Sequence, residues 1–177
     1  MGKDTLHVLL VEDDPDHADL MTLSLMETPP AGKVVHGVSD GDEALNYLFR
    51  RGKFADPGLS PRPRVILLDL RLPKVDGLTV LKEIRTSPDA ELRSIPVVVL
   101  TSSGADLDTM AAYAFGANSY VIKPVGYEDF RRLMADIGSY WLIWNRPARE
   151  HLAEGTGVGP ASVEEGTKPK TERRIVQ

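Results

Sequence analysis

Four apolar segments of the sequence each lead directly into side chains that could take part in chemistry. These side chains are Glu12 with Asp13, then Asp69, Thr101 and Lys123. A charged group at the end of a buried segment is costly unless a partner or ligand compensates it. If the segments are neighbouring strands of one open α/β sheet, the three carboxylates, the hydroxyl and the lysine converge at the edge where such sheets bind ligands.

Three carboxylates at one site repel one another, so the cluster requires a cation. Oxygen ligands favour a hard ion such as Mg²⁺, and the sequence has no cysteine and no histidines at ligand spacing. A carboxylate cluster with Mg²⁺, a hydroxyl and a lysine suits phosphoryl transfer, with one carboxylate as the nucleophile. A flavin or nucleotide site fits poorly, because the first strand–helix turn is acidic rather than glycine-rich.

Each of these residues alone also has an ordinary structural interpretation. Asp69 could cap a helix or loop, and the pair Glu12 and Asp13 could be acidic residues at the start of a helix. Thr101 could belong to a turn, and Lys123 could lie on the surface. The combination, rather than any single residue, indicates a site.

Strands and helices must alternate to bring these residues together. Apolar runs predict strands at 6–11, 33–38, 65–68, 96–100 and 119–122. Helical spacing and start signals predict five helices, at 15–27, from Ser39 to about 48, from Asp76, at 106–115 and at 127–145. Segments 52–64 and 87–95 are expected to be irregular connections.

This alternation predicts an α/β fold with a doubly wound, five-stranded parallel sheet of order 2-1-3-4-5, flanked by five helices. Segment 33–38 is the most amphipathic strand, so we expect it at an edge. Residues 1–145 should form one domain. After Pro147 the periodicity is lost, and residues 146–177 are expected to be a flexible tail.

Composition limits the possible partners. The net charge is −5, which gives no general attraction to DNA or anionic lipid. The first apolar run is too short for a signal peptide or membrane span, so we expect a cytoplasmic protein without DNA or membrane contacts.

The last residues are locally basic, at Lys168, Lys170, Arg173 and Arg174. A solvated tail is the simpler interpretation, and contact with nucleic acid or a partner is the alternative.

Four stretches resemble the response-regulator receiver family, in the right order over residues 6 to 140. They are LLVEDDP at 9–15, LLDLRLPKVDG at 67–77, VVLT at 98–101 and GANSYVIKP at 116–124. Two further stretches, NYLFRRG at 46–52 and YWLIWN at 140–145, resemble the regulators associated with bacterial and cyanobacterial phytochromes. The resemblance implies the flavodoxin-like receiver fold.

The resemblance also implies residue roles. Asp69 would be the phosphoacceptor, and it would hold Mg²⁺ together with the Asp13 side chain and the Arg71 backbone carbonyl. Glu12 would act on the ion through water, and Lys123 would pair with the phosphoryl group.

Two further residues would form the switch. Thr101 would move to hydrogen-bond the phosphoryl group, and Tyr120 would follow inward. The Lys123–Pro124 peptide bond would be cis.

The implied function is two-component signalling: a phosphoryl group from a sensor histidine kinase, by resemblance a bacteriophytochrome, is transferred to Asp69. Such a protein is not an enzyme beyond its own phosphorylation and dephosphorylation. The residues after Asn145 are too few for a helix-turn-helix domain, so we expect the protein to signal by contact with another protein or to act as a phosphate sink.

A haloacid-dehalogenase-like phosphatase and an interaction domain with an idle site are the alternative functions. The former is disfavoured because such enzymes carry a second Asp where Arg71 stands.

The end of the last predicted helix suggests a homodimer. At about 100° per residue, Trp141 and Trp144 fall on the core face, whereas Leu142 and Ile143 fall outside it. An exposed apolar cluster of this kind usually marks a contact surface. We therefore expect Tyr140, Leu142, Ile143 and Trp144 to form a symmetric interface, unless the tail folds back over them.

Overall fold

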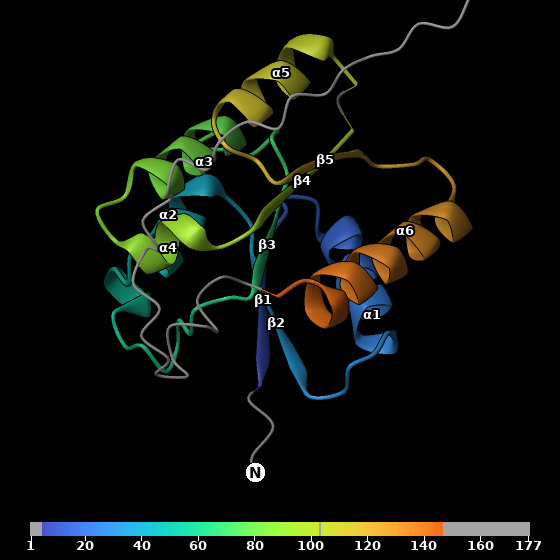
Figure 1. Ribbon diagram of the computed structural model, residues 1–177, viewed down its shortest axis with the longest axis horizontal. Coiled ribbons are helices and arrows are strands. Elements are labelled where there is room, and N and C mark those ends of the chain that lie inside the picture. Colours follow the sequence, from blue (N-terminus) through green and yellow to red (C-terminus); the bar gives the residue numbers. More distant parts are fainter. Residues whose placement is uncertain (1–4, 103, 147–177) are drawn as a thin grey trace, which may run out of the picture.

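Five parallel strands form one sheet in the order β2-β1-β3-β4-β5, which confirms the predicted topology and the edge position of β2. The computed structural model describes residues 5–102 and 104–146. Figure 1 shows the sheet running through the middle of the molecule. The strands are β1 (Leu6–Val11), β2 (Lys33–Val38), β3 (Val65–Leu68), β4 (Val97–Thr101) and β5 (Ser119–Ile122).

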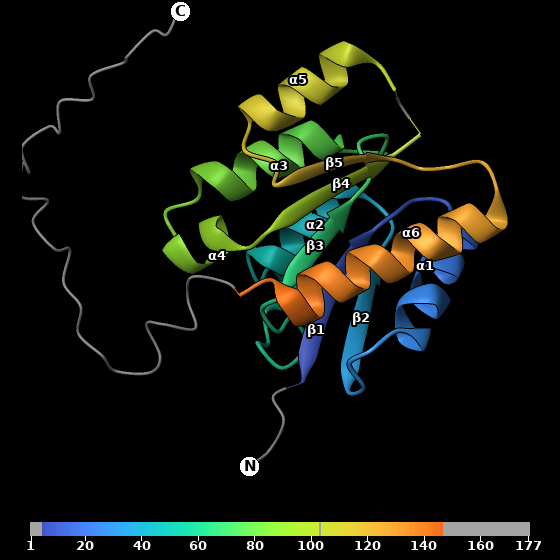
Figure 2. The same cartoon turned by 45° about the vertical axis from the view of Figure 1, so that its right-hand side comes forward.

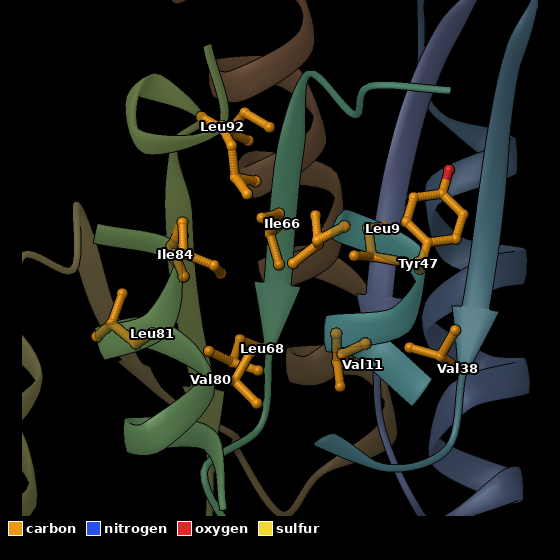
Figure 3. Close-up of a cluster of buried hydrophobic side chains, with 14 residues drawn as sticks. Leu9, Val11, Val38, Tyr47, Ile66, Leu68, Val80, Leu81, Ile84 and Leu92 are labelled. Carbon is orange, nitrogen blue, oxygen red and sulfur yellow. The ribbon is translucent and has the colours of Figure 1, made fainter. Parts of the chain in front are cut away.

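The central strands are apolar on both faces because helices cover both faces of the sheet. In β1, Leu9 and Val11 belong to one core cluster, while Val8 and Leu10 belong to the other. The same alternation continues in β3, where Ile66 and Leu68 share the cluster of Leu9 and Val11 (Figure 3).

Two layers of helices enclose the sheet, as Figures 1 and 2 show. On one face, α1 packs against α6. On the other face, α2 packs against α3, and α3 contacts both α4 and α5. The helices are α1 (Pro15–Glu27), α2 (Gly41–Leu48), α3 (Gly77–Thr86), α4 (Ala90–Ser94), α5 (Asp106–Ala114) and α6 (Tyr127–Ser139).

Aspartates cap the helices that follow β1, β2 and β3. Asp14 accepts hydrogen bonds from the backbone N–H groups of Asp16 and His17 at the start of α1. Asp40 and Asp76 cap α2 and α3 in the same way. A side-chain acceptor at this position satisfies N–H groups that the helix leaves unpaired, so each cap stabilises the start of its helix.

Two predicted connections contain short helices. The 3₁₀ helix η1 (Gly52–Phe54) lies within 52–64, and α4 lies within 87–95. The described part of the chain therefore has six α-helices around the sheet, where the sequence predicted five. Asp89 caps α4 and Leu92 is fully buried. A single buried leucine gives no helical period, which is why the sequence pattern did not reveal α4.

The last helix differs most from the sequence prediction. α6 ends at Ser139 and continues as the π-helical turn η2 (Tyr140–Trp144), closed by a 2.7 Å hydrogen bond from Asn145 N to Tyr140 O. A π-helix takes more residues per turn than an α-helix, so each side chain after Ser139 is rotated less than predicted. Leu142 is consequently buried, with 4% of its surface exposed, and joins the core cluster on the α1–α6 face.

The prediction that Leu142 is exposed is therefore wrong, and so is the core position of Trp144, which is 76% exposed. Within the described ranges, no helix is long and apolar enough to cross a membrane. The predicted tail, beyond Arg146, lies outside the described residues.

Candidate functional site

The register of the sheet brings the predicted residues together. Val11 pairs with Leu68, and Leu68 pairs with Val99. On the far side of β4, Thr101 pairs with Ile122. The residues that follow these strand ends therefore meet at the carboxyl edge of the sheet. They are Glu12, Asp13, Asp69 and Lys123, with Thr101 as the last residue of β4.

Lys123 stands between two of the carboxylates. Its Nζ donates hydrogen bonds to Glu12 Oε2 and Asp69 Oδ2, both at 2.5 Å. All three side chains are buried. Buried charges are tolerated when they are paired and hydrogen-bonded, and this lysine supplies the pairing for both acids.

Burial and pairing act in opposite directions on the protonation of the cluster. Burial raises the pKa of Glu12, and the hydrogen bond from Lys123 only partly offsets that effect. Burial alone would lower the pKa of Lys123, but its hydrogen bonds to Asp69 and Glu12 raise that pKa above its usual value. Lys123 is therefore a fixed positive charge at neutral pH.

The donor set fits a hard divalent cation. Carboxylate oxygens of Glu12, Asp13 and Asp69 all lie within 4.8 Å of one another. Asp13 is exposed while the other two are buried, so one side of the cluster is open to solvent. Oxygen ligands with room for water suit Mg²⁺, which keeps part of its hydration shell in proteins.

The loop after β3 holds Asp69 in place. Asp69 Oδ1 accepts a hydrogen bond from the Arg71 backbone N–H at 3.0 Å. The loop then folds back so closely that a Cβ on Gly77 would lie 2.2 Å from the Asp69 carbonyl oxygen. Only glycine fits there, so Gly77 contributes to the position of Asp69.

Thr101 and Tyr120 lie next to this cluster on neighbouring strands. Thr101 is fully buried, and its carbonyl accepts a 2.8 Å hydrogen bond from Lys123 N. Tyr120 is half-buried and packs against the small core cluster of Leu70, Val99 and Ala112. Both predicted switch residues are therefore placed near the phosphoacceptor candidate, and their motion stays a prediction.

The expected cis bond at Lys123–Pro124 is not present. Pro29–Pro30 is the one cis peptide among residues 5–102 and 104–146. Lys123 reaches the carboxylates without it, because the backbone hydrogen bond to Thr101 extends the β4–β5 pairing to Lys123 itself.

Three contacts at the site were not found from the sequence. His17 Nδ1 lies 3.7 Å from Glu12 Oε1, the Arg71 side chain bonds Asp108 of α5 at 3.0 Å, and Lys74 bonds the α2 cap Asp40 at 2.6 Å. The first pair is five residues apart, across the turn from β1 to α1. The other two join segments more than thirty residues apart, and no local pattern signals such contacts.

Comparison with known proteins connects this site to a family. The model of the response regulator receiver domain matches residues 8–135. The probable methanogenesis regulatory protein FilR2 of Methanothrix harundinacea is 44% identical over 145 residues, which cover 82% of this chain and 89% of that protein. Response regulator Rcp1 of Synechocystis is 38% identical over 135 residues, 76% of this chain and 88% of that protein.

Two solved structures are similar over nearly their whole length. The phosphorylated cyanobacterial phytochrome response regulator RcpA has a TM-score of 0.76 at 34% identity, covering 81% of this chain and 99% of its own. The Mn²⁺-bound form of Rcp1 has a TM-score of 0.73 at 36% identity, and the match covers 80% of this chain and 98% of the Rcp1 chain.

Proposed function

Because the chain belongs to the response-regulator receiver family, whose members are phosphoacceptor signalling proteins, we propose that Asp69 is its phosphoacceptor and a sensor histidine kinase its donor. The observation that carries the proposal is the position of Asp69. Its carboxylate lies between Lys123 and a cluster of oxygens suited to Mg²⁺. Family membership also sets aside the haloacid-dehalogenase-like phosphatase.

The transfer follows from this geometry. A carboxylate oxygen of Asp69 attacks the phosphorus of a phosphohistidine on the kinase, and the P–N bond breaks with its electron pair on the imidazole nitrogen. Mg²⁺, when bound, neutralises charge on the phosphoryl oxygens. Lys123 is released from Asp69 Oδ2 and pairs with one of these oxygens instead.

The cation would be held by few protein groups. Asp13 and Asp69 would bind it with their side chains and Arg71 with its backbone carbonyl, while Glu12 would act through water. The Mn²⁺-bound form of Rcp1 supports a divalent cation at a site of this type. The exposure of Asp13 supports a partly hydrated ion.

Phosphorylation would be read out through Thr101 and Tyr120. Thr101 would hydrogen-bond a phosphoryl oxygen, and Tyr120 would move into the space near β4. The support is their placement on neighbouring strands beside Lys123. The phosphorylated protein would pass on its signal by contact with another protein rather than with DNA.

The kinase would be a phytochrome of the bacteriophytochrome class, acting in the cytoplasm. RcpA is described as a phytochrome response regulator, and segments 46–52 and 140–145 support the same group. The test is phosphotransfer from a panel of purified histidine kinases, including bacteriophytochromes. Fast transfer from a phytochrome kinase is expected, and preference for an unrelated kinase would contradict this assignment.

The phosphoacceptor itself is tested without a kinase. Incubation with acetyl phosphate and Mg²⁺ should add one labile phosphoryl group per chain, detected by intact mass. Asp69→Asn should abolish this adduct, and Asp76→Asn, in the same loop, should retain it. An adduct that persists in Asp69→Asn would rule out the assignment.

A symmetric homodimer remains part of the proposal, with a corrected interface. Leu142 is no longer part of the proposed interface, because its side chain is buried in the core. Tyr140, Ile143 and Trp144 of η2 are exposed. Further exposed apolar side chains lie on α5 and β5, at Leu107, Met110 and Ile122. α5 and β5 contact each other, and exposed apolar side chains of this kind support a contact surface.

A further inference from the structure

Two histidines form a close pair away from the acidic site. Nδ1 of His7 on β1 lies 3.0 Å from Nε2 of His36 on β2, and the ring centroids are 5.2 Å apart. Both side chains are half-buried. His7 precedes Glu12 by five residues, which corresponds to about 16 Å along a strand, so the pair is separate from the acidic site.

The sheet and an anchored aromatic ring hold the pair in place. In the parallel register His7 faces Val34, and His36 faces Leu9. The His36 ring also packs on Tyr47, with centroids 5.5 Å apart. Tyr47 is buried beside Leu9 (Figure 3), and its hydroxyl donates a hydrogen bond to the Pro61 carbonyl at 2.9 Å. The two ring positions are therefore set before any ligand binds.

The spacing and chemistry of the two nitrogens suit a metal ion. Ligand nitrogens about 2.0–2.1 Å from a tetrahedral or square-planar ion lie roughly 3 Å apart. Burial lowers the pKa of both rings, and the charge of His7 lowers that of His36 further. Both are therefore neutral near pH 7, the form that binds metals.

We propose that His7 and His36 form a bidentate site for a borderline transition-metal ion such as Zn²⁺. Imidazole nitrogens select Zn²⁺, Cu²⁺ or Ni²⁺ over Mg²⁺, so this site and the acidic cluster take different ions. Among the described residues no third histidine or carboxylate joins the pair, and water completes the coordination. When the ion binds, the ring whose facing nitrogen carries the proton takes up that proton on its other nitrogen, so that both facing nitrogens can coordinate the ion. The bound ion then links the edge strand β2 to β1.

The test uses the full-length chain with millimolar Mg²⁺ present, so that the acidic cluster is occupied. Zn²⁺ affinity is measured by competition with a chromophoric chelator, and ring-nitrogen resonances of the wild type are followed by NMR. One Zn²⁺ per chain is expected, with shifts at His7 and His36. His7→Asn and His36→Asn should each weaken binding at least about tenfold, since even the loss of a group that merely orients a ligand does so.

Controls separate this site from others. His17→Asn, beside the acidic cluster, and His151→Asn should keep the parent affinity, and thermal melts without zinc show whether each variant is folded. If a variant is unfolded, the NMR shifts of the His7 and His36 ring nitrogens in the wild type decide whether zinc binds to this pair. Unchanged affinity in both His7→Asn and His36→Asn, loss in His17→Asn alone, or no wild-type binding in the micromolar range would overturn the proposal.

Discussion

At the residue scale, the acidic cluster carries more negative charge than its lysine can neutralise. Lys123 pairs with Glu12 and Asp69, which leaves Asp13 outside these hydrogen bonds. Like charges this close raise the free energy of the metal-free fold. The carboxylates therefore favour cation binding, but their repulsion lowers the stability of the protein when no cation is bound.

Asp13→Ala should therefore have two effects. It should abolish Mg²⁺ binding, measured by calorimetry, because a cation ligand is lost. It should also raise the free energy of unfolding without metal by up to about 1 kcal/mol, a modest gain because Asp13 is exposed and screened. Glu83→Gln, an exposed acid on α3, should change neither quantity. A metal-free Asp13→Ala protein that unfolds at lower urea than the parent would contradict the repulsion argument.

The histidine pair makes stability depend on pH without any metal. The folded-state pKa values of His7 and His36 are lowered by burial, so the folded protein binds these protons less readily than the unfolded chain. Stability should therefore fall as pH decreases through the unfolded value of about 6.5.

Urea denaturation between pH 7.5 and 5 in a metal-free buffer checks this expectation. Glu12, whose raised pKa acts in the opposite direction, is common to parent and variant, so the comparison isolates the pair. His36→Asn should reduce the slope of stability against pH, by less than about 1.4 kcal/mol per pH unit, the limit for one proton. Equal slopes would show that the pair does not titrate as described.

At the element scale, the π-helical turn decides which side chains end in the core. Leu142 enters the α1–α6 core, while Ile143 next to it is 41% exposed. A residue outside the helix also holds this turn in place. Nη2 of Arg64, the residue before β3, donates a hydrogen bond to the Asn145 carbonyl at 2.8 Å. The end of the helix thus depends on a residue far away in the sequence.

A matched pair of truncations tests this register. Leu142→Ala should lower the free energy of unfolding by about 2–4 kcal/mol, because it leaves a cavity in the core. Ile143→Ala should cost less than about 1 kcal/mol, as expected for a largely exposed site. Guanidinium denaturation measures both. Small and similar losses in both variants would mean that the helix continues as a regular α-helix, because both side chains then fall outside the core face.

At the scale of the whole molecule, the proposed dimer would bury the exposed apolar side chains of η2, α5 and β5. The double variant Ile143→Glu, Trp144→Glu places charges in this interface and should be monomeric by light scattering, whereas the parent is dimeric. Leu59→Glu, an exposed leucine of the long loop, should remain dimeric. Equal, monomeric masses for parent and variant, with and without beryllofluoride, would contradict the dimer.

The sequence by itself determined the architecture and the composition of the acidic site. Continuous apolar runs such as Val65–Leu68, bounded by prolines, favour strands buried on both faces, and strands that alternate with helices favour one sheet order. Because parallel strands end at the same edge, Glu12, Asp69 and Lys123 could be placed together before any coordinates were known. Local pattern was sufficient here because each signal lies within a single element.

Only the tertiary structure decided the features that depend on contacts between distant segments. The π-helical turn, the burial of Leu142 and the trans bond after Lys123 all contradicted expectations drawn from an ideal helix or from resemblance. The histidine pair arises from the register of β1 against β2, and His7 and His36 are 29 residues apart. Packing and register are properties of the whole chain, because they depend on which surfaces meet, and the spacing within one segment does not contain that information.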